Sequence, residues 1–240
     1  MNESSAHRDD ALAFFRDRFD LDDAALSTAL DTALERRVDY ADLFFEYATH
    51  DSVMLEEGIV KTGDRHVEQG VGVRAQAGER QGYAHSDDVS VESMQLAATT
   101  ARTISQENGR EGSVAVASAG AGASDLYPVA TPPTEVPIER KVDLLNEIDA
   151  FARRLDPRVT QTMASALSQH RHVLVVGSDG TLSADVQPLV RLNVQVVATD
   201  ANGERRETGY QAWAAASSSI ACVVPKRGSR WSRKPCASPC

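Results

Sequence analysis

The chain has 240 residues, of which 42% are hydrophobic and 25% charged, with a formal net charge of −10 at pH 7. This composition is typical of a globular protein with a buried core and excludes a disordered chain. No run approaches the ~20 consecutive apolar residues that a membrane helix needs, and residues 1–10 are polar, unlike a signal peptide. We therefore expect a cytoplasmic protein that binds no membrane.

Acidic side chains are unevenly distributed along the chain. Glu207 is the last acidic residue, and residues 1–207 carry a net charge of −15. Such a surface repels phosphate backbones, so we expect no nucleic acid partner. All three cysteines follow Tyr210, and a body without cysteine argues against a disulfide framework.

The first third of the chain predicts two helices followed by a strand. Apolar residues recur at helical spacing over residues 11–19 and again over residues 22–34. From Tyr40 the period changes to two, which predicts a strand over residues 40–55. Glu57-Gly58 then predicts a tight turn.

An antiparallel meander and a helix are expected next. We predict a return strand over residues 59–67, a separate strand over residues 69–77 and a hairpin strand over residues 81–85. Residues 86–88 are Ser-Asp-Asp, a typical cap for the helix whose apolar face runs over residues 94–104.

The second half begins with a connector. Residues 109–136 are rich in Gly, Ala, Ser and Pro and predict a linker. A helix is predicted over residues 137–155. Four strands are predicted after it: residues 159–169, 171–176, 181–186 and 189–199.

These elements predict an α+β fold with helices packed on antiparallel sheets. The order suggests two successive helix-plus-sheet units, an N-terminal domain over residues 1–108 and a central segment over residues 137–210. Neither unit shows a residue-level internal repeat of the other.

Residues 211–240 differ in composition from the rest of the chain. Trp, Cys, Arg, Ser and Pro gather there without acidic residues or periodicity, which we interpret as translation in the wrong frame. The alternative is a genuine basic tail that binds an acidic partner or holds paired or metal-binding cysteines. Cys236-x-x-x-Cys240 at the terminus makes a poor zinc ribbon, so we expect free thiols.

Few residue patterns predict chemistry. His170-x-His172 would project from one face of a strand but has no evident third metal ligand, so we expect two structural histidines. Gly70-x-Gly72 precedes no helix, which favours a strand-entry turn over a phosphate loop. The carboxylate pairs Glu56-Glu57 and Asp87-Asp88 are adjacent, which disfavours joint acid/base work, and we expect the second pair to cap a helix. We assign no catalytic and no metal-binding residue.

Several ordered blocks resemble a known family. The blocks DYADLFFEY, LEEGIVKTG and EQGVGVRAQAGER, at residues 39–47, 55–63 and 68–80, are similar to the N-terminal domain of the TldD/PmbA family, also described as modulators of DNA gyrase, and to its TldD branch. The block VLVVGSDGTLSADVQPLVRLNVQVV at residues 173–197 resembles the segment that leads toward the catalytic half. The resemblance covers most of residues 10–210.

The resemblance implies a cytoplasmic zinc-dependent peptidase that acts on small or unfolded peptides as a heterodimer of TldD-like and PmbA-like chains. The family's zinc is held by a His-Glu-x-x-x-His helix and a further ligand, and none of these positions exists in this chain. We therefore expect the N-terminal, non-catalytic part of such an enzyme, inactive alone, with a PmbA-like subunit or a second copy as partner.

Two other functions stay open. The chain could be a non-catalytic peptide-binding or assembly module that pairs with a PmbA-like subunit. A small-molecule or nucleotide-binding α+β protein has only scattered glycines in its favour. Arg74 and Tyr83 are candidates for lining a peptide cleft, and an exposed sheet edge could take a peptide by strand addition. The structural interpretation of the same blocks is hairpin geometry and core packing.

Overall fold

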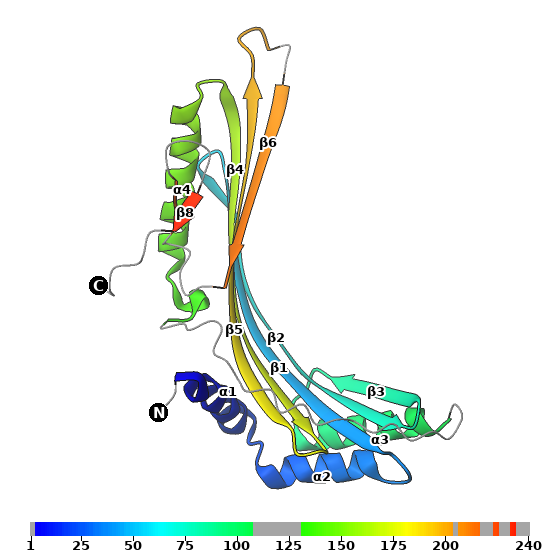
Figure 1. Cartoon of the computed structure of the whole chain (residues 1–240). Coiled ribbons are helices and arrows are strands. Elements are labelled where there is room, and N and C mark those ends of the chain that lie inside the picture. The colour runs from blue at the N-terminus through cyan, green and yellow to red at the C-terminus, as the bar shows by residue number, and fades with distance from the viewer. Residues whose placement is uncertain (1–2, 108–130, 204–205, 217–222, 226–230, 234–240) are drawn as a thin grey trace. The chain divides into compact units, whose positions relative to one another are not determined.

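The chain folds as helices packed on an antiparallel sheet, which confirms the predicted α+β class (Figure 1). The computed structural model describes residues 3–107, 131–203, 206–216, 223–225 and 231–233. The helices within these ranges are α1 (Glu3–Phe19), α2 (Asp23–Leu34), α3 (Val91–Glu107), the 3-10 turn η1 (Pro133–Glu135) and α4 (Ile138–Leu155). The strands are β1 (Tyr40–Glu56), β2 (Ile59–Ala77), β3 (Arg80–Ser86), β4 (Val159–Gly177), β5 (Leu182–Thr199), β6 (Arg206–Ala215), β7 (Val223–Pro225) and β8 (Trp231–Arg233).

The main sheet has six strands in the order β3-β2-β1-β4-β5-β6, and β7 pairs only with β8. At one end of the order, β2 and β3 pair antiparallel with Arg74 opposite Tyr83. At the other end, β5 and β6 pair antiparallel with Gln195 opposite Tyr210. Hairpins join most neighbouring strands, as the turn signals in the sequence predict.

Three pairs of predicted strands are single continuous strands, so the prediction of separate strands is wrong. Residues 59–67 and 69–77 both belong to β2, and the predicted breaks near residues 170 and 187 fall inside β4 and β5. In β2 the side chains from Ile59 to Gln69 are all exposed, so backbone pairing rather than an apolar period defines this part of the strand. In β5, Pro188 precedes Val190, where the pairing with β6 begins, so the missing N–H of Pro188 costs no bond to β6.

The chain forms two compact units that are not consecutive in sequence. Unit 1 comprises Met1–Ala48, Val67–Leu126 and Arg171–Val186. Unit 2 comprises Thr49–His66, Tyr127–His170 and Gln187–Cys240. Each unit therefore draws its strands from both halves of the chain. The expected linker, residues 109–136, lies mostly outside the described residues, and η1 forms near its end.

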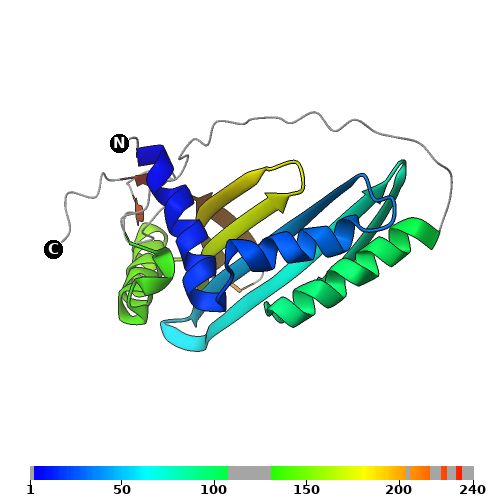
Figure 2. The same cartoon turned by 90° about the horizontal axis from the view of Figure 1, so that it is seen from below.

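In unit 1, helices α1, α2 and α3 lie against one face of the sheet (Figure 2). The helix α2 begins where Asp22 accepts a hydrogen bond from the Ala25 nitrogen at 2.7 Å, a cap that satisfies one of the free N–H groups of its first turn. The core gathers aromatic and aliphatic side chains of α1, β1, β2 and α3, including Phe15, Leu43, Phe45 and Met94. Burial of this apolar face is the main stabilising contribution to unit 1.

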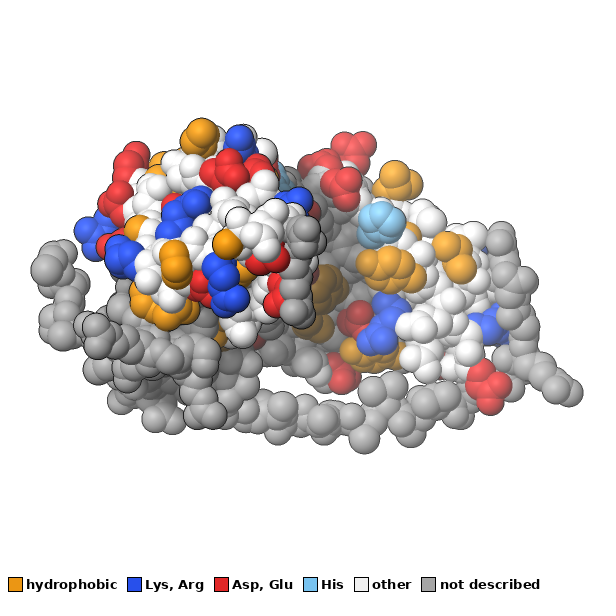
Figure 3. Space-filling view, turned by 90° about the horizontal axis from the view of Figure 1, so that it is seen from above, with side chains coloured by type: hydrophobic (Ala, Val, Ile, Leu, Met, Phe, Trp, Pro, Cys, Tyr) orange, Lys and Arg blue, Asp and Glu red, His pale blue; other side chains and the backbone are white. Residues whose placement is uncertain are grey.

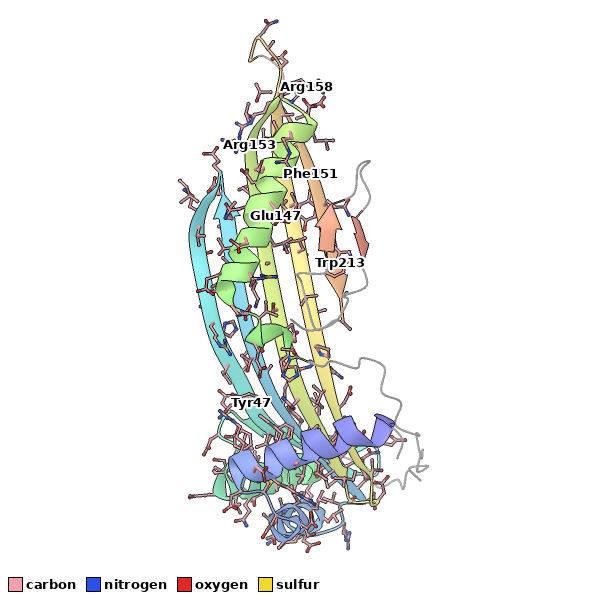
Figure 4. The ribbon with its side chains drawn as sticks, turned by 90° about the vertical axis from the view of Figure 1, so that its left-hand side faces the viewer. Tyr47, Glu147, Phe151, Arg153, Arg158 and Trp213 are labelled. Carbon is pink, nitrogen blue, oxygen red and sulfur yellow. The ribbon has the colours of Figure 1, made fainter. Side chains whose placement is uncertain are left out.

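In unit 2, helix α4 packs on the sheet through one apolar stripe. Leu144, Leu145 and Ile148 meet apolar residues of β1, β4 and β5, and Trp213 of β6 (Figure 4) packs against the same cluster. The stripe includes one charged residue, Lys141, which is only 1% exposed. Its Nζ lies 2.5 Å from Oδ1 of Asp51, so the buried ammonium has a carboxylate partner.

Candidate functional site

The face of the unit 1 sheet that points away from α1, α2 and α3 carries aromatic and charged side chains. We call it the open face because no described helix covers it. Residues facing the helices alternate along each strand with residues on this face, as strand geometry requires. Figure 3 shows hydrophobic, histidine and charged side chains gathered on it, at the right of the view. Its members on β1, β2 and β3 include Phe44, Glu46, Gly72, Arg74, Tyr83 and His85.

The open face contains a pocket of about 250 Å³, which we call the aromatic pocket. It is lined by residues of β1, β2, β3 and the loop after β3: Phe44, Glu46, Glu68, Gln69, Gly70, Val71, Gly72, Tyr83, His85, Ser86 and Asp87. Phe44 and Tyr83 are 38% and 56% exposed, which leaves their rings accessible to a ligand. The ring centroid of Tyr83 lies 6.0 Å from that of His85.

Two glycines of β2 let groups of β3 approach closely beside the hollow. A Cβ on Gly72 would lie 2.6 Å from the hydroxyl of Tyr83, and a Cβ on Gly70 would lie 2.9 Å from the Ser86 carbonyl oxygen. A side chain at either position would therefore collide with β3. The prediction that Gly70-x-Gly72 is a strand-entry turn is wrong, because both residues lie inside β2 and allow the close approach of neighbouring groups.

The aromatic pocket is lined by carboxylates and by no lysine or arginine. Glu46, Glu68 and Asp87 are its acidic residues. Glu46 also meets the guanidinium of Arg171, with 3.5 Å between Oε2 and Nη1. Of the predicted cap pair, Asp88 accepts hydrogen bonds from Ser90 and Ser93 near the start of α3, each at 2.8 Å, whereas Asp87 lines the pocket.

Arg74, one of the two predicted cleft residues, is tied to the sheet. Its Nε donates to Oδ2 of the buried Asp42 at 2.8 Å, and its Nη2 donates to the same oxygen. This hydrogen bond raises the pKa of Arg74 above its ordinary value. Burial, followed by the charge of Asp42, raises the pKa of the neighbouring Tyr40. Arg74 therefore stays charged. It is not one of the residues that line the aromatic pocket.

Tyr83, the other predicted cleft residue, does line the aromatic pocket. It lies opposite Arg74 in the register of β2 and β3, so the two side chains are neighbours on the open face. The sequence indicated Arg74 and Tyr83 but not Phe44, which also lines the pocket. The alternation of β1 could have placed Phe44 on the open face, because its neighbours Leu43 and Phe45 carry the buried face.

A second hollow, of about 150 Å³, lies on the sheet of unit 2. Its lining includes the thioethers of Met54 and Met163 and the ring of Tyr210. The Tyr210 hydroxyl donates to Oδ1 of Asn193 at 3.0 Å. Tyr210 is 60% exposed, so it resembles Tyr83 in exposure but has no carboxylate among its pocket neighbours.

Several histidines lie on the described strands. His172 stacks on Phe14 in unit 1, with 4.0 Å between ring centroids, which agrees with a structural role. In unit 2 the rings of His50 and His66 stack at 4.8 Å, and Nδ1 of His66 lies 2.7 Å from Oδ2 of Asp64. These histidines lie on strands, so they do not fit a motif of two histidines one helical turn apart. We derive no zinc chemistry from them.

The sequence did not indicate the pairing of His50 with His66. The two residues lie at nearly equal chain distance from the Glu57-Gly58 turn, and a hairpin brings such residues opposite each other. The sequence does not show the register of this long hairpin, and without the register the two histidines cannot be paired.

His170 in unit 2 gives a pH-dependent stability. Burial, opposed by a smaller effect of Glu135, lowers the pKa of His170 below 6.5, so the unfolded chain takes up this proton first as the pH falls. The stabilisation is present above pH 6.5 and is lost as the pH falls through the lowered folded-state pKa. Urea unfolding at pH values on both sides of 6.5 should show a smaller loss for His170→Gln than for the wild type; equal losses would contradict this assignment.

Two family models match the chain. The PmbA/TldA metallopeptidase domain 1 matches residues 41–105, and the PmbA/TldA metallopeptidase central domain matches residues 131–222. The second match extends beyond Tyr210, where the sequence analysis placed the end of the resemblance, and β6 likewise continues to Ala215. All three cysteines lie outside the described residues. None of the described helices is long and apolar enough to cross a membrane.

Curated relatives and solved structures agree with these matches. The Metalloprotease TldD homolog of Haemophilus influenzae is 38% identical over 182 residues, which cover 75% of this chain and 37% of the relative. The Metalloprotease TldD homolog of Buchnera aphidicola subsp. Acyrthosiphon pisum is 32% identical over 185 residues, covering 77% and 38%. The chain thus spans little more than a third of either relative.

Two crystal structures share the fold at low sequence identity. A protein named as a modulator of DNA gyrase from Bacteroides thetaiotaomicron superposes with a TM-score of 0.68 at 14% identity, over 81% of this chain and 45% of that one. TldE from Thermococcus kodakarensis gives a TM-score of 0.58 at 17% identity, over 79% and 42%. Together with the two domain matches, these similarities show that the chain belongs to the PmbA/TldD metallopeptidase family and corresponds to its N-terminal portion.

Proposed function

We propose that this chain is the non-catalytic, substrate-contacting part of a TldD-type zinc metallopeptidase that acts on small or unfolded peptides in the cytoplasm. Its relatives named Metalloprotease TldD homolog support the enzyme class. The 240 residues contain no His-Glu-x-x-x-His sequence, so the chemistry requires residues that this chain does not supply.

The missing motif matters because of what a bound zinc ion supplies. It polarises a water molecule for attack on the amide, with about three protein ligands and a nearby carboxylate that takes the proton. Without such a set of ligands, the residues of this chain can bind and orient a peptide but have no activated water with which to cleave it.

The observation that carries the peptide-contacting role is the aromatic pocket on the open face of unit 1. A sheet face with a small pocket suits an extended chain, because single side chains can enter the hollow while the backbone runs along the strands. The strand β3 is the last strand on this side of the sheet, so its outer edge could also add a peptide strand. Tyr83 lies on β3 and lines the pocket. A peptide added to the edge of β3 would therefore run close to the pocket that receives its side chains.

A second candidate function is assembly with a PmbA-like subunit or with a second copy of this chain. Ile59 and Val60 of β2 in unit 2 are 60% and 45% exposed. The two side chains project from opposite faces of the strand, and Ile59, the more exposed of them, offers an apolar contact for another protein. Co-expression with a PmbA-like chain, followed by size-exclusion chromatography, tests this function: co-elution lost in an Ile59→Lys variant would support it, and independent elution would contradict it.

Purified protein tests the leading proposal. We expect it to bind unfolded peptides, measured by fluorescence anisotropy, and to cleave none of them when zinc is supplied, measured by mass spectrometry. Tight stoichiometric zinc binding together with cleavage that a chelator abolishes would show that the chain is catalytic and contradict the proposal. Cleavage that persists in chelator would point to a contaminating peptidase.

A further inference from the structure

We propose that the hollow on the sheet of unit 2 accepts an apolar side chain of the bound peptide. This inference rests on the proposed peptide-contacting function and deepens it, because it adds a second place of contact and names the class of side chain that enters it. The hollow, which we call the methionine hollow, is lined by Met54, Met163, Ala164, Ser165, Asn193, Gln195 and Tyr210. All of these residues belong to unit 2.

Four neighbouring strands form the methionine hollow. Its lining residues lie on β1, β4, β5 and β6, which are adjacent in the sheet. Side chains alternate between the two faces of a strand. Leu192, the neighbour of Asn193 on β5, packs in the cluster against α4. The side chain of Asn193 therefore lies on the face of the sheet opposite α4, and the hollow opens on that face.

The amide of Asn193 is already hydrogen-bonded to its surroundings. Its oxygen accepts hydrogen bonds from the Tyr210 hydroxyl and from Nε of Arg191, each at 3.0 Å. Its nitrogen donates to Oγ of Ser165 at 3.1 Å. A polar ligand would gain little by exchanging these bonds for its own. An apolar ligand leaves all of them in place.

Apolar groups make up most of the remaining surface of the methionine hollow. The thioethers of Met54 and Met163 and the ring of Tyr210 supply much of it. Methionine side chains are flexible and polarisable, so they adapt to ligands of different shape. The ring of Tyr210 is exposed and offers a large apolar contact area to a ligand.

The absence of charge from this lining disfavours a charged ligand. None of the residues that line the methionine hollow is Asp, Glu, Lys or Arg. An ammonium or carboxylate group that entered would lose hydration without meeting an opposite charge among them. An apolar side chain instead gains free energy by leaving water. The volume of about 150 Å³ suits one side chain rather than a folded domain.

A matched series of labelled peptides tests the inference on the full chain by fluorescence anisotropy. The peptides are N-acetylated and differ at one central position, which is norleucine, alanine, lysine or glutamate. We expect the norleucine peptide to bind about tenfold more tightly than the alanine peptide, because its longer side chain removes more apolar surface from water. The lysine and glutamate peptides should bind more weakly than the norleucine peptide.

The glutamate peptide also tests the one basic group that borders the methionine hollow. Arg191 is not a lining residue, but it contacts Asn193. If the glutamate peptide binds most tightly of the series, the guanidinium of Arg191 attracts an acid to this site and the inference is overturned.

Two substitutions of similar size place the preference at the methionine hollow. Met163→Gln makes the lining more polar, so it should reduce the preference for norleucine over alanine toward unity. Gln195→Glu adds a carboxylate, so the lysine peptide should then bind at least as tightly as the norleucine peptide. The two variants change the lining on different strands, β4 and β5.

Each substitution has a matched control in unit 2. Leu155→Gln controls for Met163→Gln, because Leu155 is exposed at the end of α4. Gln211→Glu controls for Gln195→Glu, because Gln211 shares a face of β6 with Trp213, which packs in the cluster against α4. Both controls should keep the wild-type preferences. Circular dichroism verifies that each variant is folded.

The outcomes separate the inference from the proposed function. If wild-type protein binds the norleucine and alanine peptides equally, the inference is overturned while peptide binding stands. If both hollow variants keep the wild-type preferences, the methionine hollow is not their source and the inference is again overturned. If no peptide of the series binds, both the inference and the peptide-contacting role are wrong.

Discussion

Replacing Lys141 with alanine is expected to lower the free energy of unfolding of unit 2 by about 3–5 kcal/mol, the cost of leaving one partner of a buried ion pair without the other. The Lys141 side chain is 1% exposed, and its Nζ lies 2.5 Å from Oδ1 of Asp51. In the variant, the Asp51 carboxylate would keep its burial and lose this charged partner. Urea unfolding followed by tryptophan fluorescence measures the effect, because Trp213 packs in the same unit.

Two further variants show whether burial of an unpaired charge is the cause. Lys61→Ala removes an exposed lysine of the same unit and should change the free energy of unfolding by no more than about 0.5 kcal/mol. The double substitution Lys141→Met with Asp51→Leu removes both charges and should recover most of the loss. If the double variant is as unstable as Lys141→Ala, lost packing rather than an unpaired carboxylate explains the effect.

Replacing Gly82 with alanine is expected to destabilise unit 1 by about 3 kcal/mol, toward the upper end of the cost of overpacking. A Cβ at this position would collide with the carbonyl oxygen of Ala101 and lie 2.7 Å from the backbone nitrogen of Ser105. Both atoms belong to the backbone of α3, so a rotamer change cannot relieve the clash. The helix would have to move away from β3, and amide hydrogen exchange in α3 should increase.

Gly63→Ala is the matched control, because it also adds one methyl group to a strand glycine. Its Cβ would lie 3.6 Å from the Ile138 side chain, an ordinary contact. We expect unchanged or slightly increased stability, since alanine restricts the unfolded chain more than glycine does. If both changes destabilise the protein equally, the cause is the added methyl group on a strand glycine in general, and the contact between β3 and α3 does not explain the loss at Gly82.

The sequence predicted α2 and α4 closely because each buries an apolar stripe, whereas α1 begins at Glu3, eight residues before the predicted stretch. The apolar period over residues 137–155 predicts α4 to within one residue of Ile138–Leu155, and the stripe that gives the period is the one that contacts the sheet. The full length of β2 was not predictable in this way. Strands were predicted over residues 59–67 and 69–77, but Ile59–Gln69 are exposed, so no continuous apolar alternation shows that the two form one strand.

The candidate site was predictable only in part for a related reason. Tyr83 was identified from the sequence, but its place beside Phe44 and Gly72 in one pocket depends on the register of three strands. The bond between Arg74 and Asp42 joins residues 32 positions apart. A single sequence contains no signal for such a pairing, because arginine and aspartate are both common on exposed surfaces without any partner.

The interleaving of the units limits how the protein can be divided for study. A fragment ending at residue 108 would lack Arg171–Val186, which belongs to unit 1 and supplies Leu174 and Ala184 to its core. Such a fragment would leave apolar surface uncovered even though it contains the whole domain 1 match at residues 41–105. The boundaries of the family domain therefore differ from the boundaries of a segment that could fold alone. Experiments that divide the chain should keep the residues of both halves that belong to each unit.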